Sequence, residues 1–210
     1  MKETENISGY KYRDSKLNPS HAYLLPQIQL LLRNSGLIGR APPIAIFDVG
    51  CGNGSVAHEL AKDDLHVIGI DPSEEGIAQA KEAYPDLRLE TGSAYDDLSA
   101  TYGTFDVVVS LEVVCHLFFP RMFAKTVYNL TKPDGIAIIS APYHGYWKNL
   151  IMALTGKMNG HFRPLWDYGY VKFWSVATLR ELLIEAGFKS VEFRFAGRFW
   201  PILLKNSGIA

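Results

Sequence analysis

The feature that most constrains the fold is a glycine-rich turn set directly between an apolar run and a helical pattern. Residues 44–49 (IAIFDV) indicate a short buried strand, and residues 55–62 indicate a helix. The intervening GCGNG places Gly50, Gly52 and Gly54 at the turn. Glycine tolerates positive φ and lets a ligand approach the backbone closely. The free amides at the start of the following helix can then face that ligand.

The alternation of apolar strand and helix continues along the chain. Further strands are expected over residues 66–70, 87–90, 105–110, 136–140 and 191–195, and further helices over residues 21–35, 72–84, 122–130 and 176–186. Uninterrupted apolar strands separated by helices indicate a parallel sheet buried on both faces. The sequence therefore predicts a doubly wound α/β fold.

A length of 210 residues suits one domain, and no repeat or long linker divides it. We expect an N-terminal flap and helix at 1–35, a ligand-binding core at 44–140, a substrate-side insert at 141–175, and a C-terminal helix with strands at 176–210. The polar N-terminus lacks the apolar stretch of a signal peptide, and no apolar run has the length of a spanning helix. With two cysteines that make no disulfide framework, we expect a cytoplasmic protein.

An acidic residue accompanies the glycine turn. Asp71 ends the second expected strand, where a carboxylate can accept hydrogen bonds from both hydroxyls of a ribose. The glycines follow the spacing G-x-G-x-G and not G-x-G-x-x-G. A dinucleotide lays its pyrophosphate against such a turn, whereas a sulfonium nucleoside has no phosphate to cradle. The alternative is a tight turn that binds no ligand.

At these residues the chain resembles the class I S-adenosylmethionine-dependent methyltransferases. The first motif of that family, acid-x-G-x-G-x-G, corresponds to residues 48–54, and later motifs correspond to residues 92–94, 105–108, 132–135 and 185–188. The resemblance implies a Rossmann-like, mostly parallel seven-stranded sheet with helices on both faces. Because the chain stops at Ala210, we expect the last strand to be short or truncated.

The resemblance also implies a binding site for S-adenosylmethionine, which leaves as S-adenosylhomocysteine. Asp71 is expected to hold the ribose, Ser93 and Ala94 to border the adenine, and Leu111–Glu112 to line the other side. The full set of expected cosubstrate-binding residues is His21, Asp48, Gly50, Gly52, Asn53, Gly54, Asp71, Pro72, Ser93, Ala94 and Leu111.

Within this class the chain is most similar to the ubiquinone-biosynthesis O-methyltransferases, which methylate phenolic hydroxyls. Their E-x-x-E-H motif corresponds to residues 112–116, with Cys115 in place of the second glutamate. Their N-P-x-R stretch, whose arginine meets the cosubstrate carboxylate, corresponds to residues 18–21, with His21 in place of the arginine. We expect His21, with Tyr10 or Lys11 on the N-terminal flap, to close over the cosubstrate.

Methyl transfer to a hydroxyl needs alignment of the nucleophile and loss of its proton. His116 is the candidate general base, with Glu112 orienting it; the alternative is a histidine that only packs or caps. If residues 112–116 are helical, Glu112, Cys115 and His116 share one face and could bind a divalent metal. A divalent metal at this trio is possible, but the interpretation without a metal is favoured.

The segment 141–175 leaves room for substrate recognition beyond the carboxyl ends of the strands. Its aromatic side chains suit a planar or amphipathic acceptor, and Tyr143, His144 and Trp166 are the expected substrate contacts. Residues 146–158 have amphipathic helical spacing, which predicts a lid packed on its own domain or a peripheral contact with a bilayer surface.

We therefore predict methyl transfer to a small molecule, most reasonably to a hydroxyl of an aromatic or amphipathic acceptor. A nicotinamide-dependent oxidoreductase is disfavoured by the glycine spacing. A non-catalytic nucleoside-binding domain would leave His116 and the aromatic segment without a role. A net charge of −1 and the lack of an asparagine-proline-proline-aromatic motif argue against a nucleic-acid substrate.

Overall fold

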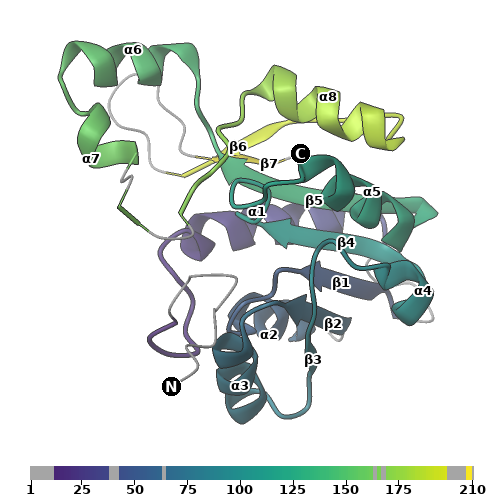
Figure 1. The fold of residues 1–210 in the computed structure, drawn as a ribbon. Coiled ribbons are helices and arrows are strands. Elements are labelled where there is room, and N and C mark those ends of the chain that lie inside the picture. The colour runs from purple at the N-terminus through teal and green to yellow at the C-terminus, as the bar shows by residue number, and fades with distance from the viewer. Residues whose placement is uncertain are drawn as a thin grey trace.

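A twisted sheet forms the centre of the protein, and helices cover both of its faces (Figure 1). The computed structural model describes residues 12–37, 43–62, 65–162, 165–166 and 169–197, together with the backbone of residues 207–209. Within these residues the sheet has seven strands in the order β3-β2-β1-β4-β5-β7-β6. The expected doubly wound, Rossmann-like fold is confirmed.

The strands are β1 (Ala45–Val49), β2 (His66–Asp71), β3 (Arg88–Thr91), β4 (Phe105–Leu111), β5 (Thr131–Pro142), β6 (Arg194–Ala196) and β7 (Ser207–Ile209). The helices are α1 (His21–Asn34), α2 (Ser55–Ala61), α3 (Glu74–Ala83), α4 (Leu98–Tyr102), α5 (Pro120–Leu130), α6 (Tyr146–Leu154), α7 (Met158–Phe162) and α8 (Val176–Ala186).

The five strands β1 to β5 pair in parallel, while β7 runs antiparallel between β5 and β6. The final strand is short, as expected, with three residues between Ser207 and Ile209. Because the first five strands are parallel, the carboxyl ends of β1, β2, β4 and β5 meet at one edge of the sheet. The candidate site lies at this edge.

The apolar strands pack against helices on both sides because successive side chains leave a strand on opposite faces. In β1, Ile46 joins one buried cluster with α1, α2 and α3, whereas Phe47 and Val49 join a second cluster with α5 and α8. In β4, Val107 and Val109 face the first cluster and Val108 faces the second. This double burial explains why the strands show no polar alternation.

Local capping fixes several helix starts. Ser73 accepts a hydrogen bond from Gly76 N at 3.0 Å and begins α3 directly after the end of β2. Ser175 and Thr178 form a capping box that begins α8, and Gly187 ends that helix. The bounds of α8 agree with the prediction because both of its ends are encoded locally.

Four features of the fold differ from the expectation. Strand β6 begins at Arg194 and not at residue 191. Helix α4, whose N-cap Asp97 accepts from Ala100 N at 3.2 Å, was not predicted. Strand β5 is longer than the expected residues 136–140. The register of its pairing with β4 shifts between Phe105 and Val107. The segment after β5 contains two helices, α6 and α7, which project away from the sheet (Figure 1).

Candidate functional site

The glycine turn joins the carboxyl end of β1 to α2. The amides of Gly50 and Cys51 both donate to the Ile70 carbonyl of β2, at 2.8 and 2.9 Å. Gly54 is the N-cap of α2 with φ 74°, a left-handed conformation that glycine adopts without strain. The turn is therefore tied to β2, and the start of α2 is directed toward the sheet edge.

Asp71 holds the turn from the end of β2. Its Oδ2 accepts from Gly52 N at 3.0 Å and its Oδ1 accepts from Ser73 N at 2.8 Å. Burial raises the pKa of Asp71 to about 6, although these two amides act in the opposite direction. Each carboxylate oxygen keeps a further lone pair for a ligand. Pro72, which follows, is half-buried.

A second carboxylate, Asp48, lies on β1 and is 2% exposed. Burial and, secondarily, the charge of Asp71 raise the pKa of Asp48 to about 7. Its Oδ2 has no hydrogen-bond partner among the described residues. An unpartnered buried oxygen beside the turn is available to a hydrogen-bond donor or a cation.

The N-terminal segment lies across the glycine turn, and we call residues 12–17 the N-terminal strap. The Tyr12 hydroxyl lies directly against Gly52, and the Tyr12 ring contacts Gly76 on α3. A side chain at Gly52 would collide with the Tyr12 ring. The strap thus forms one wall of the site, and this part of it was not predicted.

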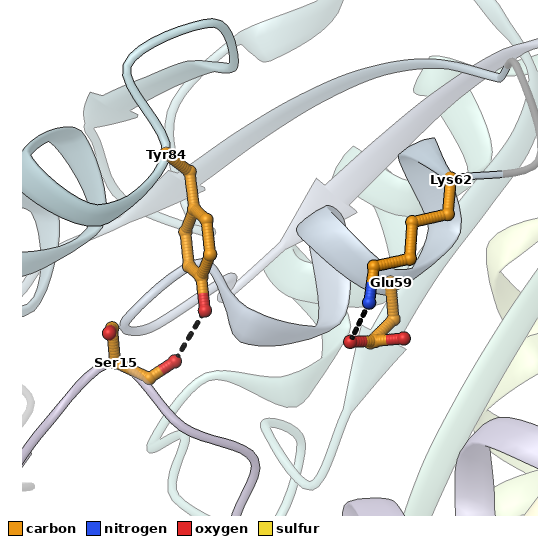
Figure 2. A network of polar contacts seen from close by, with 4 residues as sticks. All are labelled: Ser15, Glu59, Lys62 and Tyr84. Atoms are coloured by element: carbon orange, nitrogen blue, oxygen red, sulfur yellow. Dashed lines mark hydrogen bonds and ion pairs between the residues drawn. The ribbon is translucent and has the colours of Figure 1, made fainter.

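Three side chains anchor the strap through its backbone carbonyls. Asn53 Nδ2 donates to the carbonyls of Asp14 and Lys16, at 2.8 and 3.0 Å. Gln79 Nε2 donates to Tyr12 O at 2.9 Å, and the Tyr84 hydroxyl donates to Ser15 O at 2.6 Å (Figure 2). Asn53 Oδ1 meanwhile accepts from Ser55, so this amide holds protein groups on both sides.

His21 begins α1. Its Nδ1 accepts a long hydrogen bond from Asn18 N at 3.4 Å, which leaves the proton of the neutral ring on Nε2 as a donor. Burial lowers the pKa of His21 to about 4. The ring is therefore neutral at physiological pH. The other expected flap residues, Tyr10 and Lys11, lie outside the described residues.

Apolar groups follow β3 and β4 at the same edge of the sheet. Ala94 and Leu111 are buried, and the Val113 side chain lies against Gly50. Ser93 follows β3, where its amide donates to Asp96 Oδ2 at 2.8 Å. These residues lie at the carboxyl ends of β3 and β4, as the motifs predicted.

Glu112 follows β4 in a strained conformation with φ 60°, and it is the one non-glycine residue with a positive φ in the described part of the chain. Its amide donates to Ser140 O at 3.1 Å and to Ser140 Oγ at 3.0 Å. Ser140 Oγ donates to Glu112 Oε1 at 2.8 Å. Strand β5 therefore fixes both the backbone and the carboxylate of Glu112.

The conditional expectation of a helix over residues 112–116 is wrong. These residues form bends and turns, because Glu112 has left-handed torsion angles and its amide is bonded to Ser140. Cys115 is buried, and its thiol donates to Glu112 O at 3.1 Å. Burial is the main cause that raises the pKa of the Cys115 thiol. Among the described residues, no group of three His, Cys, Asp or Glu is placed to hold a metal ion, so Glu112, Cys115 and His116 do not form the trio considered.

His116 is oriented by the segment before α8. Its Nδ1 lies 3.2 Å from Gly169 O. Because a carbonyl only accepts, Nδ1 carries the proton, and in the neutral ring Nε2 carries the lone pair. The ring packs against Tyr170 and Trp166, with centroids 4.9 and 6.0 Å away. A neutral imidazole with an unprotonated Nε2 can accept a proton.

The other expected substrate residues lie after β5. Tyr143 packs edge-on against Phe195, and His144 lies among His161, Phe162 and Phe173. Burial first, and then the charges of Lys148 and His161, lower the pKa of His144 to about 4. The aromatic side chains are thus present on the substrate side, in two groups: one around His116 and one around His144.

Helix α6 and the start of α7 carry several exposed apolar side chains. They are Tyr146, Trp147, Ile151, Leu154 and Met158, and Leu165 is also exposed. In the described part of the chain, no helix has the length and apolar character needed to cross a membrane. Contact of residues 146–158 with a bilayer surface stays a prediction.

The methyltransferase domain family matches residues 20–192 of the chain. The chain belongs to this family. The class I S-adenosylmethionine-dependent methyltransferase expected from the motifs is thereby confirmed, and the match covers the glycine turn, the end of β2, His116 and the segment after β5.

Curated relatives of this methyltransferase include ubiquinone biosynthesis O-methyltransferases. The protein from Aromatoleum aromaticum is 26% identical over 182 residues, which cover 85% of this chain and 76% of the relative. The protein from Maricaulis maris is 31% identical over 153 residues, covering 68% of this chain and 60% of the relative. The chain therefore spans less than two thirds of the Maricaulis protein.

Solved structures with the same fold include methyltransferases. Magnesium protoporphyrin IX methyltransferase from Synechocystis PCC 6803, solved with bound SAH, has a TM-score of 0.67 at 19% identity over 89% of this chain and 80% of its own. Phosphoethanolamine N-methyltransferase 2 from Haemonchus contortus has a TM-score of 0.57 at 19% identity, covering 81% of this chain and 38% of its own. These likenesses concern the fold.

The methyltransferase site thus gathers most of the expected residues at one edge of the sheet. Sequence reasoning missed Tyr12, Gly169, Tyr170 and Lys148. None of these belongs to a motif, and each reaches the site through contacts with distant parts of the chain. The aromatic richness of residues 141–175 was the one available signal for Tyr170.

Proposed function

We propose that this methyltransferase transfers a methyl group from S-adenosylmethionine to a hydroxyl oxygen of a small aromatic or amphipathic acceptor. The observation that carries the proposal is the geometry of His116. Its Nδ1 faces the Gly169 carbonyl at 3.2 Å, its Nε2 is an acceptor, and two aromatic rings surround it. A phenol or alcohol must lose a proton during transfer, and a neutral histidine can receive that proton.

In this proposal the cosubstrate lies along the glycine turn. Its ribose hydroxyls bond to Asp71, its adenine lies between Ala94 and Leu111, and its methionine portion passes over Gly50 and Gly52. Support comes from the tie between Asp71 Oδ2 and Gly52 N at 3.0 Å, which places the carboxylate beside the turn. The cationic sulfonium is compatible with the buried carboxylates there.

The acceptor is proposed to enter from the side of α6 and α7, between the aromatic groups around His116 and His144. Trp166, Tyr170 and Tyr143 offer planar faces with polar edges, which suit an aromatic ring. A net charge of −1 provides no attraction for nucleic acid. A small-molecule acceptor, a cytoplasmic location and the absence of a nucleic-acid partner stay predictions.

The direct test is methyl transfer to defined probes. The protein is incubated with methyl-labelled S-adenosylmethionine and catechol, 4-nitrocatechol, benzyl alcohol or benzylamine, and products are identified by mass spectrometry. We expect O-methylated products from the catechols and none from the amine. Transfer to the amine alone, or to none of the four probes, would contradict O-methylation of aromatic hydroxyls.

Asp71→Asn should weaken binding of S-adenosylhomocysteine by about 1–3 kcal/mol, the usual effect of removing a charged hydrogen-bond acceptor. Asparagine keeps the shape of the side chain but has one acceptor oxygen, so it can accept from Gly52 N or from Ser73 N but not from both. The loss therefore includes the contact with the turn as well as the contact with the ribose, and thermal unfolding measures the first part separately. Calorimetry measures the affinity. Asp86→Asn, at an exposed position, is the control and should bind S-adenosylhomocysteine with unchanged affinity. If Asp71→Asn bound it with the same affinity as this control, Asp71 would not be the residue that binds the ribose.

Removing residues 1–17 should weaken binding of S-adenosylhomocysteine about fivefold, since Tyr12 would no longer cover Gly52 and one hydrogen bond or packing contact is worth about 1 kcal/mol. The deletion stops before α1, whose Leu24 and Ile28 are fully buried. Thermal unfolding should show an intact core. If the truncated protein bound as tightly as the full chain, the strap would have no part in the site.

A further inference from the structure

Lys148 on α6 extends back toward the carboxyl edge of the sheet. The residue is half-buried, and its Nζ donates to the carbonyl of Tyr143, directly after β5, at 3.1 Å. Its neighbours Tyr146 and Trp147 are largely exposed on the same helix. Lysine side chains normally keep the ammonium in water, so an inward ammonium requires another explanation.

The ammonium lies within electrostatic range of two groups at this edge. Burial lowers the pKa of Lys148, and the Glu112 carboxylate raises it in the opposite direction. The charge of Lys148 in turn helps to lower the pKa of His144. Lys148 therefore lies at the carboxyl end of β5, where its Nζ donates to Tyr143 O, with the charge of Glu112 and the ring of His144 in electrostatic range.

The anionic neighbour of Lys148 is held in place. Ser140 accepts the Glu112 amide and donates to Glu112 Oε1 at 2.8 Å, and Glu112 keeps φ 60°. Strained backbone persists where the surrounding structure fixes it, and such residues cluster at functional sites. An ammonium that donates to Tyr143 O, with a fixed carboxylate in electrostatic range, has a defined position. It has three N–H donors, so further donors can face a ligand.

We propose that Lys148 donates a hydrogen bond to the acceptor oxygen that receives the methyl group and stabilises its anionic form. This inference rests on the proposed O-methylation. The hydroxyl proton passes to His116 Nε2, the oxygen forms a bond to the methyl carbon, and the carbon–sulfur bond breaks with its electron pair going to sulfur. Lys148 stays protonated throughout, and Glu112 balances its charge.

The proposal predicts a dependence on the acidity of the acceptor. Catechol is largely un-ionised at neutral pH and needs help to lose its proton, whereas 4-nitrocatechol, whose nitro group withdraws charge, is largely ionised. Lys148→Met should lower kcat/KM for catechol by about 10²-fold, as for loss of one oxyanion donor. The same variant should lower kcat/KM for 4-nitrocatechol by no more than about threefold, a small fraction of that effect.

Two further variants frame the experiment. Lys148→Arg keeps the charge and should recover most of the catechol activity. Lys157→Met, at an exposed position beyond α6, should leave both probes unaffected. Binding of S-adenosylhomocysteine by calorimetry should be the same in all variants, which checks that they are folded.

A spectroscopic measurement gives a readout without turnover. The measurement is made at a pH below the range in which free 4-nitrocatechol ionises, with S-adenosylhomocysteine bound to the protein. Under these conditions 4-nitrocatechol bound to the unaltered protein should show the absorbance of its anion. The Lys148→Met variant should show the absorbance of the un-ionised form. Equal loss of activity on both probes, or an unchanged spectrum in the variant, would overturn the role of Lys148 while leaving O-methylation standing. If the unaltered protein methylates neither probe, the proposed function fails and this inference fails with it.

Discussion

His116→Ala will lower kcat on a catechol acceptor by about 10²–10⁴, the usual contribution of a general base. The structure gives the reason. Gly169 O fixes Nδ1 as the protonated nitrogen at 3.2 Å, so Nε2 is the atom that can take the proton from the acceptor. Alanine removes this acceptor and leaves the glycine turn intact, so binding of S-adenosylhomocysteine should be unchanged. Single-turnover kinetics with labelled cosubstrate measure the chemical step.

The matched controls are the other histidines on the substrate side. His144 and His161 lie 5.2 Å apart in the neighbouring aromatic group, and the pKa of His144 is lowered to about 4, which makes it a weak base. His144→Ala and His161→Ala should therefore keep kcat within about tenfold of the unaltered protein, less than the loss of a base. If His116→Ala kept nearly full kcat while His144→Ala or His161→Ala lost it, the general base would be His144 or His161. His116 would then have only a packing role.

The parts of the site that the sequence predicts correctly are encoded over short stretches. The turn from β1 to α2 needs glycines at Gly50, Gly52 and Gly54, and the structure gives all three a positive φ. Asp71 follows directly from the end of β2, where the register with β1 places it beside that turn. In these cases the local pattern and the global fold agree.

The parts that the sequence does not predict depend on contacts between distant segments. Tyr12 reaches Gly52 because Asn53, Gln79 and Tyr84 each bind a carbonyl of the strap. No periodicity records such side-chain-to-backbone bonds. The N-terminal sequence alone therefore does not indicate whether Tyr10 or Tyr12 lies over the turn.

The segment around Glu112 shows a different limit. A helix-compatible spacing of residues 112–116 suggested a shared face, but the Glu112 amide bonds to Ser140 on the adjacent strand. Tertiary pairing overrides local spacing here. Cys115 then donates its thiol to the Glu112 carbonyl, and the Glu112 carboxylate raises the pKa of Lys148 against the effect of burial.

The contribution of Asp48 to the free energy of unfolding should fall as the pH rises from about 4 to 7. Burial raises the pKa of Asp48 from 3.8 to about 7, so in this window the folded state binds a proton that the unfolded state has released. The free energy of unfolding then decreases with increasing pH. Asp71, with its pKa raised to about 6, acts in the same direction.

Asp48→Asn should remove most of this dependence, because asparagine resembles the protonated acid and does not titrate. At pH 8 the variant should be more stable than the unaltered protein by up to about 4 kcal/mol, at about 1.36 kcal/mol per pKa unit, and near pH 4 the two should be similar. Urea unfolding across this range measures the difference. Asp106→Asn is a control with the opposite expected sign. Burial raises the pKa of Asp106, but Lys132 and the Ala45 amide lower that pKa overall. Replacing the Asp106 carboxylate should therefore destabilise the protein at neutral pH. The contrary result is a free energy of unfolding that falls between pH 4 and pH 8 by the same amount in the Asp48→Asn variant and in the unaltered protein. That result would mean that Asp48 is ionised in the folded state and that another group binds its Oδ2.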